Sequence, residues 1–284
     1  MADDDIQDED SDEGGITDDV SLKPNENADP QEIVDRKVPQ SIREKYEVFS
    51  YRNAAVILAE ARQQEFAEIV SALESFTITT EMIRTAGGNE SDIPKEFTKT
   101  LRPMGWHETI ISADLHVTLS WREATGELKK GKSVLAAKTR IIEREKYLDG
   151  HKIDYVKGKV AFDLEWNSKD QTFDRDLYAM NAFFQSGAID VGVLVTRSES
   201  LNEVFKSVGP ALTKSGEIEK TRAGVERPTM SKYGASTTWM GKLIYRLNAG
   251  RNGGCPVLAI GIKPAAVSDW KKPAKRLVFS KGRA

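Results

Sequence analysis

The chain is short of cysteine and of long apolar runs, and both absences exclude whole classes of protein. Cys255 is the only cysteine among 284 residues, so an internal disulfide and a zinc site built from several cysteines are excluded. No stretch reaches about 18 consecutive apolar residues, which excludes a membrane-spanning helix. The first residues carry neither a basic cluster nor an apolar run, so we expect no secretory signal and a cytoplasmic location.

The formal net charge of −3 hides two regions of opposite sign. Residues 1–40 hold 14 acids and 3 bases, whereas residues 41–284 hold 38 bases and 30 acids. The first region has few large apolar side chains and its like charges repel, so we expect an acidic disordered tail over 1–40. This tail is either a solubilising extension or a decoy for a basic groove. Residues 41–284 form a single domain, and their net charge of +8 favours a polyanionic partner.

Apolar periodicity predicts an α/β fold with a mixed central β-sheet flanked by helices. Asn53 is expected to cap the first long helix, and Gly150 is expected to break the chain between two strands. A nearly wholly apolar run at 188–196 suits a buried central strand. The expected strands are 108–121, 152–156, 159–167, 188–196 and 256–262, and the expected helices are 53–76, 174–185, 199–207 and 238–248.

Acidic residues gather on one predicted strand and on the strand before it. Asp163, Glu165 and Asn167 are spaced by two, so on a strand they point to the same face. A tight turn at Lys157–Gly158 brings Asp154 of the preceding strand beside Glu165. Two converging carboxylates repel each other unless a cation lies between them, and Mg²⁺ prefers such oxygen ligands. The spacing alone also fits a solvated strand face whose acids merely pair with nearby lysines.

A second pattern lies nearer the C-terminus, where residues 227–263 contain six bases and no acid. Hydroxyl and amide side chains in the same stretch can bond phosphates or base edges of DNA. The alternative is a solvated helix face with two surface loops and, for Arg197, a salt bridge to Asp190 or Glu199. The candidate DNA-binding residues are Arg197, Lys232, Ser236, Thr237, Thr238, Lys242, Arg246, Arg251 and Asn252.

The order of these blocks resembles a known group of nucleases. An Asp followed about ten residues later by Glu-x-(Lys or a polar substitute) is similar to the core of the PD-(D/E)xK nuclease superfamily. Four longer blocks resemble the BglII/BstYI family of type II restriction endonucleases, and the likeness spans about 44–263. These blocks are Asp154 to Leu177, Ile189 to Arg197, Tyr233 to Thr238 and Gly250 to Pro256.

The resemblance implies which residues act in the site. Asp154 and Glu165 would bind the divalent metal, with Asn167 at the position where lysine is usual and Lys169 able to reach the same phosphate. In an alternative register, Asp163 is the second metal ligand and Glu165 is the general base. We favour the first register because Lys169 follows Glu165 and Asn167 so closely.

The activity that the resemblance implies is Mg²⁺-dependent hydrolysis of double-stranded DNA at a short palindromic site by a homodimer, leaving a 5′-phosphate. Two other functions stay open from the sequence. One is a DNA-binding protein with an inactive nuclease core, which Asn167 in place of lysine keeps possible. The other is a repair or recombination nuclease without sequence preference.

Overall fold

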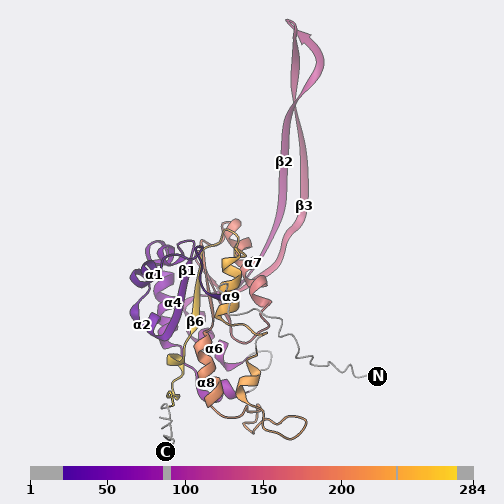
Figure 1. The fold of residues 1–284 in the computed structure, drawn as a ribbon. Coiled ribbons are helices and arrows are strands. Elements are labelled where there is room, and N and C mark those ends of the chain that lie inside the picture. Colours follow the sequence, from indigo (N-terminus) through magenta and orange to yellow (C-terminus); the bar gives the residue numbers. More distant parts are fainter. Residues whose placement is uncertain (1–21, 86–90, 235, 274–284) are drawn as a thin grey trace, which may run out of the picture.

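A six-stranded mixed sheet forms the centre of the protein (Figure 1). The computed structural model describes residues 22–85, 91–234 and 236–273. The strand order is β1-β6-β5-β4-β3-β2, with β6, β5 and β4 parallel and the other neighbours antiparallel. The mixed sheet confirms the predicted fold class. The strands are β1 (Tyr46–Tyr51), β2 (His107–Lys129), β3 (Lys132–Lys157), β4 (Val160–Glu165), β5 (Val191–Arg197) and β6 (Val257–Ile262).

Helices cover both faces of the sheet, as the alternation within β5 requires. Val193 and Val195 belong to one core, whereas Leu194 between them belongs to the other. The first core is closed by α1 (Gln31–Lys37), α2 (Gln40–Lys45), α3 (Ala54–Val56), α4 (Gln63–Ser75), α5 (Thr80–Arg84), α6 (Asp92–Leu101) and α8 (Asn202–Ser207). The second is closed by α7 (Thr172–Gln185) and α9 (Met240–Asn248). In the described ranges, no helix has the length and apolarity needed to cross a membrane.

The predicted helix over 53–76 is broken in two. Asn53 has a left-handed backbone (φ 62°) and its side chain makes no cap hydrogen bond. A π-helical turn, Ile57–Ala61, follows α3, and α4 begins only at Gln63. Arg62 lies at the break, where its Nε donates to Asp190 Oδ2 at 2.9 Å. This long-range ion pair holds Arg62 outside the helical conformation, which local periodicity did not predict.

The prediction of a disordered tail over residues 1–40 is wrong for its last part. Residues 1–21 lie outside the described residues, but Gln31–Lys37 forms α1. Val34 and Val38 are both buried in the first core. Two valines thus anchor an otherwise polar segment, and the folded domain begins before residue 41.

The strands β2 and β3 are much longer than predicted and project from the sheet as a two-stranded ribbon (Figure 1). Gly150 does not break the chain: the pairing passes from Ile111↔His151 to Ser112↔Asp149, so Gly150 is the extra residue of a β-bulge. At the tip, Lys130 and Gly131 both have positive φ, as a two-residue hairpin turn requires. We call residues 115–144 the arm.

Candidate active site

The pairing of β3 with β4 brings the predicted acids together. Tyr155 pairs with Phe162, so continuing the same register by one residue sets Asp154 opposite Asp163. Glu165 lies two residues further along β4 and therefore projects from the same face as Asp163. That face also carries Ala161, which packs in the core closed by α7. The acids thus lie between the sheet and α7.

A fourth carboxylate, Asp176 of α7, completes the group. Asp163 is only 5% exposed, and its pKa is raised well above its usual value by burial and by the charges of Asp176, Asp154 and Glu165. The pKa of Asp176 is also raised, by burial and by the charge of Glu165. Asp154, Asp163, Glu165 and Asp176, which we call the carboxylate cluster, therefore repel one another strongly.

One arginine offsets part of this repulsion. Arg175 Nη2 donates to Glu165 Oε1 at 3.1 Å and to Asp176 Oδ1 at 2.9 Å. The second oxygens of the two acids, Glu165 Oε2 and Asp176 Oδ2, are buried and receive no hydrogen bond from any described residue. Buried carboxylate oxygens without a donor are costly. Arg175 alone therefore leaves the cluster under-neutralised.

A divalent cation would neutralise the remaining negative charge of the carboxylate cluster. The donors are all carboxylate oxygens, which Mg²⁺ prefers, and two of them have no hydrogen-bond partner among the described residues. Among the described residues, no three acidic, histidine or cysteine side chains stand close enough together to hold an ion without adjustment. Metal binding therefore requires small movements of these side chains.

A cavity of about 960 Å³ opens beside the cluster. Asp154 and Glu165 of the sheet line it, together with Asn167 just beyond β4 and Lys232. Burial lowers the pKa of Lys232 to about 8, and its Nζ donates to the Arg84 carbonyl at 2.9 Å. The wall of this cavity thus combines negative charge from the sheet with one partly desolvated cation.

Asn167 and Lys169, which follow Glu165 by two and four residues, have different surroundings. Asn167 Nδ2 donates to the Lys232 carbonyl at 3.0 Å, while its Oδ1 is buried and receives no hydrogen bond from the described part of the chain. Lys169 is exposed and is not part of the cavity wall. Its backbone carbonyl accepts a hydrogen bond from the Thr172 hydroxyl. Lys169 therefore gives little support to the register that we favoured from sequence.

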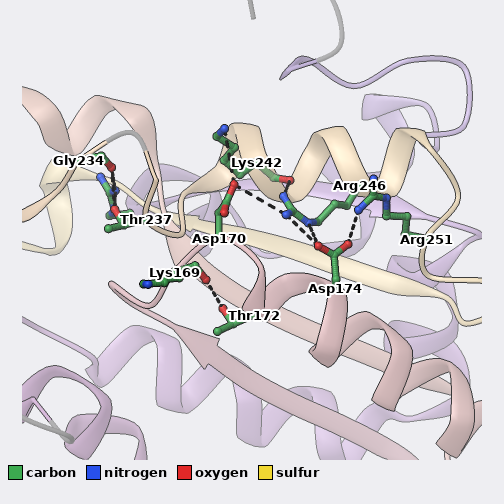
Figure 2. A network of polar contacts seen from close by, with 10 residues as sticks. Lys169, Asp170, Thr172, Asp174, Gly234, Thr237, Lys242, Arg246 and Arg251 are labelled. Carbon is green, nitrogen blue, oxygen red and sulfur yellow. Dashed lines mark hydrogen bonds and ion pairs between the residues drawn. The ribbon is translucent and has the colours of Figure 1, made fainter. Parts of the chain in front are cut away.

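The bases of the 227–263 segment are mostly neutralised by acids from elsewhere in the chain. Figure 2 shows Lys242, Arg246 and Arg251 directed at Asp170 and Asp174. Arg246 Nη2 lies 2.9 Å from Asp174 Oδ2, and Lys242 Nζ lies 3.6 Å from Asp170 Oδ2. Both acids precede the segment by more than fifty residues. Although this segment contains no acidic residue, acids from elsewhere in the chain neutralise much of its positive charge.

Four of the predicted DNA-binding residues are buried in this structure, so their side chains are not exposed for contact with DNA. Arg197 is 2% exposed; its Nε donates to the Thr238 carbonyl at 2.7 Å, and its guanidinium lies 5.5 Å from the centre of the Tyr233 ring. The predicted alternative is also absent, since Asp190 binds Arg62. The other three are Thr238 at 0%, Arg246 at 6% and Asn252 at 2% exposure.

Several residues of this region hold the local structure together. Asn252 Nδ2 donates to the Cys255 carbonyl at 2.7 Å and closes the loop before β6. Cys255 itself is buried, as its apolar surroundings predict. Thr237 Oγ1 donates to the Gly234 carbonyl at 2.8 Å (Figure 2) and accepts from Arg197. Ser236 remains exposed.

Asp176 and Arg175 are the site residues that sequence reasoning missed. Asp176 follows Phe173 by three residues and precedes Met180 by four, and both of these pack in the second core. This spacing puts Asp176 on the buried face of α7. An acid on the apolar face of an amphipathic helix was the available signal.

Comparison with known proteins assigns a family to this arrangement. The family described as "Restriction endonuclease BglII/BglIII" matches residues 46–262, well over half of the chain. Among curated proteins, none matches. The matched range contains the whole carboxylate cluster, the arm and all six strands.

Proposed function

Because the chain belongs to the BglII/BglIII family of restriction endonucleases, we propose that it is a type II site-specific deoxyribonuclease that uses Mg²⁺. The substrate is double-stranded DNA and the reaction is hydrolysis of a phosphodiester bond. The observation that carries this proposal is the carboxylate cluster, whose members repel one another and keep two buried oxygens without a donor. Such a site is stabilised when a divalent cation binds.

We assign metal binding to Asp154 and Asp163, with Glu165 able to contribute an oxygen. The β3–β4 register supports Asp163 as the acid opposite Asp154, which is the second of the two registers considered from sequence. Asn167 fits a supporting role, because its amide already donates to the Lys232 carbonyl. Asp176 of α7 adds negative charge behind the other three.

The chemistry of the step follows from these assignments. A bound Mg²⁺ supplies Lewis acidity, polarising a phosphate oxygen and lowering the pKa of a water molecule. Glu165 Oε2 has no donor and is free to accept the proton of the attacking water, while Arg175 holds Oε1 in place. Lys232, which also lines the cavity, offers positive charge to the phosphate. The bond between phosphorus and the 3′-oxygen breaks, so one product carries a 5′-phosphate and the other carries a 3′-hydroxyl whose proton comes from solvent water.

A homodimer acting on a short palindrome completes the proposal. Two-fold symmetry of the protein matches two-fold symmetry of the site, so each subunit cuts one strand. The recognition surface includes Ser236, Lys242 and Arg251, which come from or flank α9. Lys242 and Arg251 must exchange their contacts with Asp170 and Asp174 for contacts with DNA.

Digestion of plasmid-length DNA with Mg²⁺ tests this function. Discrete fragments are expected; a smear would indicate a nuclease without sequence preference, and binding without cleavage would indicate an inactive core. The variants Asp154→Ala and Glu165→Ala should abolish cleavage and leave binding largely intact. Glu32→Ala, an exposed acid on α1, is the matched control and should cut normally. Normal cleavage by both cluster variants would refute the site assignment.

A further inference from the structure

The arm exposes apolar side chains that the rest of the protein does not cover. Its pairs run from Leu115↔Arg144 outward to the tip, beyond the two cores. A two-stranded ribbon without a packed face is only marginally stable in water. Large apolar side chains that are exposed to solvent can mark a binding surface. These are Leu119 at 44%, Trp121 at 46%, Leu128 at 72%, Leu135 at 53% and Ile141 at 57% exposure.

The arm is also rich in basic residues that have no partner in the described part of the protein. It contains seven bases and three acids, a net charge of +4. Glu143 lies 3.2 Å from His116, which leaves Glu123 and Glu127 as the other acids. Within the described part of the chain, the side chains of the seven bases make no ion pair or hydrogen bond. These bases are Arg122, Lys129, Lys130, Lys132, Lys138, Arg140 and Arg144.

The strand register places Leu119 and Trp121 on one face of the arm and Ile141 and Leu135 on the other. Leu119 pairs with Arg140 and Trp121 pairs with Lys138, and directly paired residues of an antiparallel ribbon project from the same side. The face of Leu119 and Trp121 therefore carries an apolar row along β2 beside a cationic row along β3. Alternate residues in each row are roughly 7 Å apart. The turn residue Lys130 and the last strand pair, Lys129↔Lys132, add three lysines at the tip.

We propose that the arm binds duplex DNA that flanks the cleavage site. A two-stranded β-ribbon fits the major groove of DNA. There, apolar side chains can contact thymine methyl groups, and lysine and arginine side chains can contact phosphates. Arg140, Arg144 and Lys138 supply the phosphate contacts, and Leu119 and Trp121 supply the apolar contacts. This inference rests on the proposed function, in which double-stranded DNA is the substrate. A second arm carrying the same charge of +4 would be repelled, which disfavours pairing of one arm with another.

The length of the arm makes the proposal specific. Fifteen residues per strand reach roughly 50 Å from the core, which corresponds to about 15 base pairs along the duplex axis. A duplex that is too short to extend beyond the core cannot meet the arm. DNA affinity should therefore depend on duplex length as well as on salt.

The test compares DNA affinity without divalent cations on duplexes of about 12 and about 40 base pairs, over a series of salt concentrations. The variant is Lys138→Ala/Arg140→Ala/Arg144→Ala. On the long duplex, its plot of log affinity against log salt should be shallower by about 2 to 3, because each lost phosphate contact removes roughly 0.9 from the slope. On the short duplex, the variant and wild type should bind alike. Arg36→Ala/Lys206→Ala/Lys271→Ala removes three exposed bases outside the arm and should keep the wild-type slope.

An unchanged slope on the long duplex would overturn the inference. Loss of self-association by the arm variant in sedimentation, with its DNA slope unchanged, would also overturn it and would assign the arm to a second copy. Failure of the wild type to bind either duplex would refute the proposed function as well. Wild-type binding together with an unaffected arm variant would refute the arm alone.

Discussion

The arm and the 227–263 segment carry similar numbers of bases but use them in opposite ways. In the segment, Lys242, Arg246 and Arg251 meet Asp170 and Asp174 from the start of α7 (Figure 2). In the arm, the seven bases lie in solvent with no described protein partner. The same residue type therefore stabilises the fold in one region and remains available to a ligand in the other. Which of the two happens depends on the tertiary neighbours and not on the local count of charges.

The two regions also differ in what lies beneath them. The helix α9 of the segment buries Leu243, Ile244 and Leu247 in the second core. The arm has no such core. We therefore expect chemistry and stability to reside in the body of the protein, and a salt-dependent share of DNA affinity to reside in the arm.

The largest expected effect separates chemistry from binding. In single-turnover cleavage at saturating enzyme, Asp163→Asn should lower the rate by about 10³-fold, roughly 4 kcal/mol, because it removes a charge that the metal requires. The triple arm variant should cleave within about 2-fold of wild type once DNA is saturated, since its loss is in affinity. Asn167→Ala should fall between them. If the arm variant cleaved as slowly as Asp163→Asn, the assignment of chemistry to the body and of DNA affinity to the arm would be wrong.

The next effect concerns local stability. Amide hydrogen exchange should show the arm opening at a cost of about 1 to 2 kcal/mol, far below α9 and β5, which should exchange only near global unfolding. The physical reason is that the arm has backbone pairing but no buried face. Adding a duplex of about 40 base pairs should slow exchange in the arm if it binds DNA there. If the arm without DNA were as well protected from hydrogen exchange as α9, the expected difference in stability between the arm and the body would be contradicted.

A smaller effect follows from the partners of single arginines. Arg246→Ala should lower the free energy of unfolding by about 2 kcal/mol, because Arg246 is 6% exposed and donates to Asp174 and to the Lys242 carbonyl. Arg140→Ala, the matched change in the arm, should stay within about 0.5 kcal/mol of wild type. Denaturant unfolding of both variants measures this difference. Equal losses would mean that the arm arginines are structural after all.

The smallest effect is a pH dependence at Lys232. Its pKa in the folded protein is about 8, below the usual 10.5, because burial disfavours the ammonium. The unfolded chain therefore binds more protons between these two values, and this group makes folding more favourable as pH rises from 8 to 10.5. The melting temperature of wild type relative to Lys232→Met should increase over that range. Lys138→Met, an exposed arm lysine, should show no such trend, and a matching trend would remove the distinction between the two lysines.

Much of the body could be predicted from local pattern. The apolar run at 188–196 became β5, in which every residue is buried, and the helix expected at 174–185 became α7. The spacing of Asp163 and Glu165 correctly indicated acids on one strand face. Long-range contacts explain the failures: the ion pair of Arg62 with Asp190 divides the first long helix, and the bulge at Gly150 continues a strand that looked broken.

What the sequence determined by itself is the alternation of elements and the spacing of acids along one strand, because periodicity and side-chain direction are properties of adjacent residues. Tertiary structure alone decided three things: that Asp176 joins the other acids, that Arg197 is buried, and that the free bases lie on the arm. Each of these depends on which distant groups share a low-dielectric interior or are left in water. Desolvation and charge pairing act through space, so no local pattern contains them.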